Sequence, residues 1–134
     1  MTTVYLDASA ITKLVISEGE TAGLQDRVRS RSLVSSRIAV VEVLKAVARA
    51  NPIADAQPIL ARIAFVEVDA ELAVIAGRTG EPGLRALDAI HVASALRLGA
   101  EVEAFVTYDD RQAHAARTAG LHVESPGDGH AAAV

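Results

Sequence analysis

Apolar runs of strand length alternate with helical patterns along most of the chain. The run Thr3–Leu6 ends at Asp7, and Ser9 follows as an N-cap for a helix with Ile11 and Leu14 on one face. Further helices are expected at 21–31, 36–50, 56–63, 70–78 and 84–99 and before 119, and strands at 32–35, 65–68, 104–107 and 121–123. Because parallel strands need crossover connections, this alternation predicts an α/β fold, a three-layer sandwich with a parallel sheet of about five strands between helices.

The length of 134 residues is that of one domain. The sequence shows no internal repeat and no linker, and the residues after 126 are mostly small or polar. We therefore expect a single domain over residues 1–126 and a flexible tail over 127–134.

The helix expected at 84–99 has Leu, Ile, Val or Ala at almost every position, which predicts a buried helix. Asp88 is the exception. The helix macrodipole contributes only about 0.3 to 1 kcal/mol to a carboxylate in the first turn, whereas taking an ion out of water costs several kcal/mol. Either a cation or a dedicated salt-bridge partner must therefore stabilise Asp88.

Three further acids are placed to join Asp88. Asp7 and Asp109 each end an apolar strand, and Glu42 lies in an otherwise apolar helix. Ligands of open α/β sheets bind outside the carboxyl ends of the strands, so all four acids can face one edge. Two carboxylates about 4 Å apart repel by roughly 4 kcal/mol at an effective dielectric of 20, which makes a divalent cation the simplest stabilising partner.

Structural interpretations of the same acids stay open. Asp7 and Asp109 can each cap the helix that follows, and Asp88 can pair with Arg85 or His91. The lysines that can pair with Glu42 are Lys13 and Lys45.

The absence of Cys restricts any metal ligands to carboxylates and histidines. Oxygen ligands favour Mg²⁺, with Mn²⁺ as the alternative. The histidines available are His91, His114, His122 and His130, and the last three have no partner at ligand spacing.

The net charge of −4 is unusual for a protein that binds nucleic acid. Without the four candidate site acids, 13 acids face 13 bases, and arginines cluster at 27, 29, 31 and 37, either as a nucleic-acid surface or as a solvated helix end. No apolar run approaches 18 residues and no signal peptide is evident, so we expect a cytoplasmic protein without membrane contact.

Four segments resemble the successive acid motifs of PIN-domain ribonucleases, specifically the VapC toxins of bacterial toxin-antitoxin pairs. They are Leu6-Asp7-Ala8-Ser9-Ala10, Glu42 with its neighbours, the run from Leu87 to Leu96 that begins Leu-Asp-Ala-Ile-His, and Phe105-Val106-Thr107-Tyr108-Asp109. The match extends from Val4 to about Pro126 and agrees in motif order and spacing.

The resemblance implies a sheet with strand order 3-2-1-4-5 and a metal-dependent endoribonuclease. It assigns the acidic site to Asp7, Glu42, Asp88 and Asp109. Ser9 and Thr107 match small hydroxyl residues that support such a site, and Asp110 matches a variable position with a supporting acid. It also implies a homodimer and a small cognate antitoxin, VapB, whose C-terminal segment crosses the acids.

Our hypothesis is a Mg²⁺-dependent endoribonuclease toxin that hydrolyses RNA phosphodiester bonds by metal-activated water. One alternative is an aspartate-phosphorylated receiver or phosphatase, which also uses strand-end acids. Ser9, however, stands where a phosphatase needs a second acid. A receiver needs a Lys after its fifth strand, and no Lys follows the last expected strand here. The other alternative is a non-catalytic binding or repressor module with the same fold.

Overall fold

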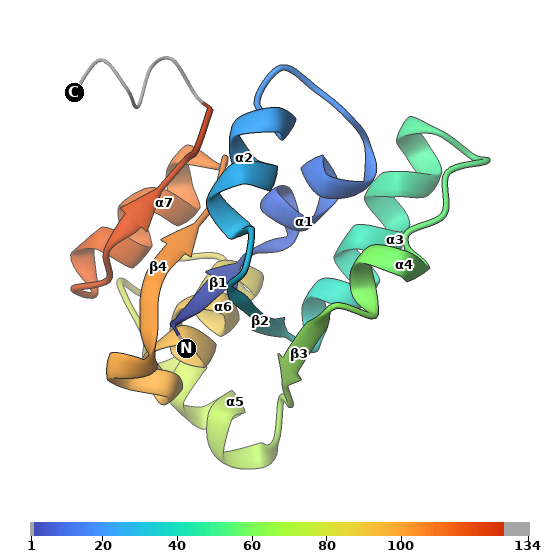
Figure 1. Cartoon of the computed structure of the whole chain (residues 1–134). Helices are drawn as coiled ribbons and strands as arrows, with labels where there is room; N and C mark the ends of the chain where they lie inside the picture. The colour runs from blue at the N-terminus through green and yellow to red at the C-terminus, as the bar shows by residue number, and fades with distance from the viewer. Residues whose placement is uncertain (1, 128–134) are drawn as a thin grey trace.

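Five parallel strands form the middle layer of the protein, in the order β3-β2-β1-β4-β5 (Figure 1). The computed structural model describes residues 2–127. Its strands are β1 Thr3–Leu6, β2 Ser32–Ser36, β3 Ile63–Val66, β4 Val102–Val106 and β5 Val123–Glu124. Its helices are α1 Ala8–Val15, α2 Thr21–Val28, α3 Ile38–Ala50, α4 Gln57–Leu60, α5 Ala70–Gly77, α6 Ala86–Leu98 and α7 Asp110–Thr118, with a 3₁₀ turn at Gly99–Glu101. The predicted α/β sandwich and its strand order are confirmed.

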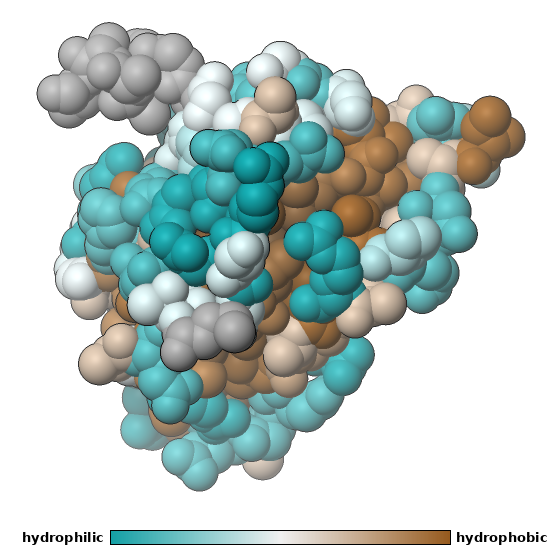
Figure 2. Space-filling view, viewed as in Figure 1, coloured by the Kyte–Doolittle hydropathy of each residue, from teal (hydrophilic) through white to brown (hydrophobic). Residues whose placement is uncertain are grey.

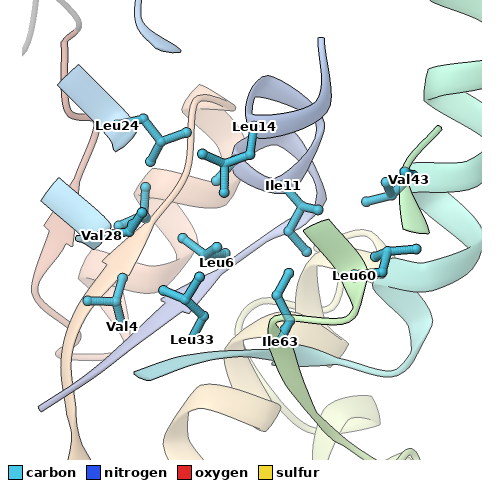
Figure 3. Packing of buried hydrophobic residues seen from close by; sticks show 14 of the residues in the cluster. Val4, Leu6, Ile11, Leu14, Leu24, Val28, Leu33, Val43, Leu60 and Ile63 are labelled. Carbon is cyan, nitrogen blue, oxygen red and sulfur yellow. The ribbon is translucent and has the colours of Figure 1, made fainter. Parts of the chain in front are cut away.

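The two faces of the sheet are buried by different helices, because successive strand residues point in opposite directions. Val4 and Leu6 of β1 belong to a core cluster with side chains of α1, α2, α3 and α4 (Figure 3). Tyr5, between them, packs with Phe105 of β4 and with Val92 of α6 on the other face. α5 then packs on the small side chains of α6, such as Ala89 and Ala93. Both faces are thus covered, as a parallel sheet requires.

Several predicted boundaries were wrong by a few residues. α1 is capped by Asp7 and not by Ser9, since both residue types are good caps and only the backbone decides between them. Pro58 does lie in the first turn of α4, but this helix ends at Leu60, and β3 begins at Ile63. The second helix ends at Val28, the fourth strand begins at 102, and the last strand is 123–124.

The helix predicted at 84–99 spans 86–98 and is not buried on all sides. Leu87 and Leu96 are each 42% exposed, whereas its small residues Ala89, Ala93 and Ala95 are buried. Small side chains let α6 approach both the sheet and α5 closely, so its larger leucines remain outside that contact. The prediction of a fully buried helix, which was based on its apolar composition, was therefore wrong for the leucines.

The surface is divided between hydrophilic and hydrophobic areas. Hydrophilic residues gather over α2, and hydrophobic surface is exposed between α2 and the α3–α4 pair (Figure 2). On α3 and in the loop after it, Val41, Leu44 and Ile53 are exposed. None of the helices in the part of the chain that the structure describes is long and apolar enough to cross a membrane. The tail predicted at 127–134, with His130, lies outside the described residues except for Gly127.

Candidate active site

The carboxyl ends of two neighbouring strands position the first two acids. β1 and β4 pair in parallel with Leu6 opposite Val106, so Asp7 and Asp109 follow at the same edge of the sheet. Glu42 comes from α3 and Asp88 from the first turn of α6, and both lie near this edge: the charges of Asp109 and Glu42 each raise the pKa of Asp88. We call Asp7, Glu42, Asp88 and Asp109 the acidic rim.

Asp7 is held in place by three hydrogen-bond donors. Its Oδ1 accepts the backbone N–H of Ala10 at 3.0 Å and the hydroxyl of Ser9 at 2.6 Å, and its Oδ2 accepts the hydroxyl of Thr107. The side chain is almost completely buried. Asp7 therefore caps α1, as one interpretation of the sequence predicted, and the same contacts fix the orientation of its carboxylate.

Ser9 and Thr107 also join Asp7 to the loop after β4. The Ser9 hydroxyl oxygen accepts the backbone N–H of Tyr108 at 2.9 Å, and that of Thr107 accepts the N–H of Asp109 at 3.1 Å. Each hydroxyl thus donates to Asp7 and accepts from the β4 loop. The spacing between the two strand ends is consequently set by side chains as well as by the sheet.

Burial raises the pKa of the Asp7 carboxyl above its ordinary value. The electrostatic influence of His91 and the hydrogen bonds from Ser9 and Thr107 act in the opposite direction. Burial has the larger effect, so the Asp7 carboxylate costs free energy unless a cation approaches it.

Asp88 and Asp109 form the more open part of the acidic rim. Desolvation raises the pKa of Asp88, and the neighbouring charge of Asp109 raises it further, while His91 and Arg85 lower it. Asp109 caps α7 by accepting the N–H groups of Arg111 and Gln112. Neither carboxylate forms an ion pair with any residue in 2–127. The predicted pairing of Asp88 with Arg85 or His91 is therefore absent there.

Glu42 has a protein partner, but it is neither of the lysines considered from the sequence. Its Oε1 lies 2.7 Å from Nε2 of His91, whose Nδ1 lies 2.7 Å from the hydroxyl of Tyr5. Lys13 instead pairs with Glu18 and Glu20. Glu42 is thus connected to the interior of the protein through a buried histidine.

Comparison with known proteins is consistent with this arrangement. A family model described as PIN domain matches residues 4–118. Ribonuclease VapC46 of Mycobacterium tuberculosis is 40% identical over 129 residues, which cover 94% of this chain and 99% of that protein. The chain belongs to the VapC ribonucleases of the PIN domain family. Ribonuclease VapC35 of the same species is 36% identical over 131 residues, with 92% of this chain and 97% of the relative covered.

Solved structures of VapC proteins share the fold. The crystal structure of VapC20 of M. tuberculosis, described as a sarcin-ricin loop cleaving toxin, has a TM-score of 0.67 at 17% identity and covers 88% of this chain and 95% of its own. VapBC2 from Rickettsia felis, solved with a DNA fragment from its promoter, has a TM-score of 0.63 at 13% identity, with coverages of 93% and 99%. At these identities the likeness shows the fold alone.

VapC nucleases are generally metal-dependent, and the donors at this VapC rim fit a hard divalent cation. No three carboxylate or imidazole groups within residues 2–127 lie close enough together to enclose an ion by themselves. Mg²⁺, however, commonly takes only one or two protein carboxylates and keeps several of its waters. Oxygen donors without a cationic partner, as at Asp88 and Asp109, suit such a hydrated ion.

A groove of about 730 Å³ borders the acidic rim on the side of Glu42. It runs between α1 and α3, with Lys45 and Arg49 on one wall and the apolar side chains of Val41 and Leu87 beside them. Lys45 and Arg49 form no ion pair among the described residues. This groove thus combines free cations with an apolar surface.

A second groove, of about 680 Å³, borders Asp88 and Asp110 between the loop before α6 and α7. Arg85 and Arg111 line it, and neither forms an ion pair within residues 2–127. His114 lies in the same groove and is exposed. The acidic rim of this VapC therefore lies between two grooves that carry free arginines or lysines.

Sequence reasoning missed two contacts that support the VapC site. His91 was considered only as a metal ligand or as a partner of Asp88, because neither Glu42 nor Tyr5 lies near it in sequence. Gln112 of α7 is buried and donates to the backbone carbonyl of Asp88 at 3.2 Å. A glutamine on the buried face of a helix, next to Ala113 and Ala116, is the signal that could have indicated it.

Proposed function

We propose that this VapC is an endoribonuclease toxin that hydrolyses RNA phosphodiester bonds with Mg²⁺ or Mn²⁺ at the acidic rim. Asp7, Glu42, Asp88 and Asp109 are the proposed ligands and catalytic residues. The observation that carries the proposal is Asp88, whose pKa is raised by desolvation and by Asp109 and which has no ion-pair partner in residues 2–127. An uncompensated carboxylate beside another acid is what a cation-binding site requires.

The roles of the chain's own residues follow from their contacts. When bound, the divalent ion lowers the pKa of a water molecule and neutralises negative charge on the scissile phosphate. Ser9 and Thr107 hold Asp7 at a fixed angle, and Thr107 also fixes the backbone of Asp109. Asp110, exposed at the start of α7, is a supporting acid at the edge of the second groove. The carboxylates bind and orient, and none forms a covalent intermediate.

The two grooves support an RNA path across the acidic rim. A phosphodiester needs its flanking phosphates held by cations, and free cations lie on both sides: Lys45 and Arg49 beside Glu42, Arg85 and Arg111 beside Asp88. A strand that enters one groove and leaves through the other passes over the acids. RNA is thus the proposed substrate, and the cytoplasm the proposed location of the reaction.

A cognate VapB-type antitoxin is the proposed inhibitor. The apolar lining of the first groove, with Val41 55% exposed, offers a docking surface next to Glu42. An arginine of the partner can form bidentate hydrogen bonds with the carboxylates and replace the metal charge. The structure of VapBC2 of R. felis with a promoter DNA fragment supports a VapB-type partner for a VapC protein.

We also propose a homodimer. The support for it is the exposure of Val74 and Ile75 on α5, which line neither groove. Analytical ultracentrifugation of the wild type and of Ile75→Asp tests it, with a monomeric wild type as the contradicting result.

The test of the proposed function is incubation of the purified protein with RNA, with and without EDTA. We expect cleavage that needs Mg²⁺ or Mn²⁺ and that falls by about 100-fold or more in Asp88→Asn, because each 1.4 kcal/mol of lost transition-state stabilisation is tenfold in rate. The matched control is Asp69→Asn, which removes an acid at the start of α5 that is paired with Arg97. Cleavage that persists in EDTA would contradict the proposal, and an inactive wild type would favour a non-catalytic binding module.

A further inference from the structure

His91 has almost no freedom to move. It lies on α6 one turn after Asp88, and its side chain is 2% exposed. Its ring packs edge-on against Tyr5, with centroids 5.8 Å apart and planes at 83°, and Tyr5 in turn stacks on Phe105 at 4.9 Å. Packing between rigid aromatic rings therefore fixes the position of the imidazole.

Both ring nitrogens of His91 are occupied by protein partners. The hydroxyl of Tyr5 lies 2.7 Å from Nδ1, and Oε1 of Glu42 lies 2.7 Å from Nε2. When the Tyr5 hydroxyl donates to Nδ1, the hydrogen of the ring is on Nε2 and is donated to Glu42. With both nitrogens engaged, His91 has no lone pair left for a metal ion, so the ligand role considered from the sequence does not fit this geometry.

The contact leaves one oxygen of Glu42 available. Oε1 is bound by His91, which forms the one Glu42 side-chain hydrogen bond found among residues 2–127, and Oε2 is not among the buried atoms without a partner there. The Glu42 side chain is 24% exposed and borders the first groove. The long Glu42 side chain, in the second turn of α3, thus has one oxygen anchored to a buried residue and the other accessible to solvent.

We propose that His91, held by Tyr5, is a positioning residue that anchors Glu42 so that its Oε2 is presented to the divalent ion. The inference rests on the proposed function, in which Glu42 is a metal ligand. Partners that orient a metal ligand commonly contribute 10- to 100-fold to metal affinity. Without His91, Glu42 has to lose its side-chain freedom at the moment of binding.

The test is calorimetric titration with Mn²⁺, without RNA, on four variants and the wild type. His91→Phe keeps the ring but removes the donor, and we expect about 10- to 100-fold weaker Mn²⁺ binding. His91→Gln places an amide N–H near the position of Nε2 and is expected to recover most of the affinity. Tyr5→Phe keeps the stacked ring but removes the hydroxyl, and a loss smaller than that of His91→Phe is expected.

Val28→Ala is the control for a general loss of stability, because it removes core volume on α2, a helix that carries none of the four rim acids. It should melt at a lower temperature and bind Mn²⁺ with wild-type affinity. Equal affinity in His91→Phe and wild type, or equal losses in His91→Phe and His91→Gln, would overturn the positioning role; if His91→Phe does not fold, His91→Gln and Tyr5→Phe decide. A wild type that binds no Mn²⁺ would instead contradict the proposed function itself.

Discussion

Two groups of carboxylates in this protein have opposite surroundings. Near α2, β4 and β5, the side chains of Arg27, Arg31, Glu103 and Glu124 form what we call the ion-paired corner. Arg27 donates to Glu124 at 2.6 Å and to Glu103 at 3.1 Å, and Arg31 donates to Glu103 at 2.8 Å. The hydrogen bonds from Arg27 lower the pKa of Glu124, and those from Arg31 and Arg27 lower the pKa of Glu103.

At the acidic rim the shifts go the other way. Burial raises the pKa of Asp7, and desolvation followed by the charge of Asp109 raises that of Asp88. The chain has 13 lysines and arginines, so cations are available, and the ion-paired corner shows that the fold can place them beside carboxylates. The absence of ion pairs at Asp88 and Asp109, within residues 2–127, therefore supports the proposed cation site.

The same comparison explains the arginine cluster seen in the sequence. Arg27 and Arg31 pair with the corner glutamates, Arg29 pairs with Asp26, and Arg37 pairs with Glu67. The cluster is thus committed to intramolecular ion pairs, and it is not the free basic surface that RNA needs.

The largest contrast is expected in the response to metal. Mg²⁺ at a hundredfold excess over its Kd should stabilise the wild type by about 2.7 kcal/mol and Asp88→Asn much less, because an ion that binds only the folded state stabilises it. Thermal melts in EDTA and in Mg²⁺ measure this difference. Glu124→Gln, which removes a carboxylate from the ion-paired corner, should keep the full metal response. If Mg²⁺ stabilised Asp88→Asn as strongly as the wild type, the proposed difference between the acidic rim and the ion-paired corner would be contradicted.

A smaller effect is expected from the ion-paired corner itself. Arg27→Ala should lower the free energy of unfolding by about 1 kcal/mol, because it leaves Glu124 partly buried without its main partner. Chemical denaturation measures the loss, and RNA cleavage should be unchanged. Arg29→Ala is the matched control, since its pair with Asp26 is exposed on both sides and should contribute little. A loss of cleavage in Arg27→Ala would mean that the corner supports the site.

The smallest effect is the pH dependence of stability without metal, and its sign separates the two groups. A raised pKa means that the Asp88 carboxyl stabilises the fold only while protonated, at low pH, and that this contribution is lost as the pH rises through the raised value. In EDTA at pH 7, Asp88→Asn should therefore melt at a slightly higher temperature than the wild type. The gain in free energy of unfolding is at most about 1 kcal/mol, because water screens the group. The difference should vanish as the pH falls and the wild-type carboxyl becomes protonated.

Glu124→Gln should show the opposite sign. A lowered pKa means that the Glu124 carboxylate stabilises the fold at neutral pH, and that this stability is lost as the pH falls through the lowered value. This variant should therefore melt below the wild type at pH 7 and approach it in acid. If Asp88→Asn also melted below the wild type in EDTA, a protein cation such as Arg85 would be holding Asp88.

The fold could be predicted closely because its signals are local. The apolar run before Asp7, the run before Asp109 and the helical patterns between them define alternating elements whose parallel packing follows from connection length. Helix boundaries were less certain where two neighbouring residues can both act as the N-cap, as Asp7 and Ser9 can at the start of α1. The resemblance supplied the strand order, which no local pattern contains.

The acids of the proposed site could be selected from the sequence, whereas the contacts that hold them could not. An acid after a strand or inside an apolar helix stands out by type alone, as Asp7 and Asp88 did. The contact of His91 with Glu42 spans 49 positions and that with Tyr5 spans 86, so it depends on which helix covers which strand. A buried histidine on an apolar helix indicates a partner, but only the packed structure shows which one.

The hydroxyl of Thr107 reaches Asp7 across 100 positions of sequence. During synthesis, β1 and its carboxylate leave the ribosome long before β4 exists to pair with them. An incomplete chain therefore has neither the strand that fixes Asp7 nor the loop that carries Asp109, and it has no assembled site. The proposed site can therefore act only when the chain is nearly finished, and the surface beside Glu42 that we propose for an antitoxin is complete only then.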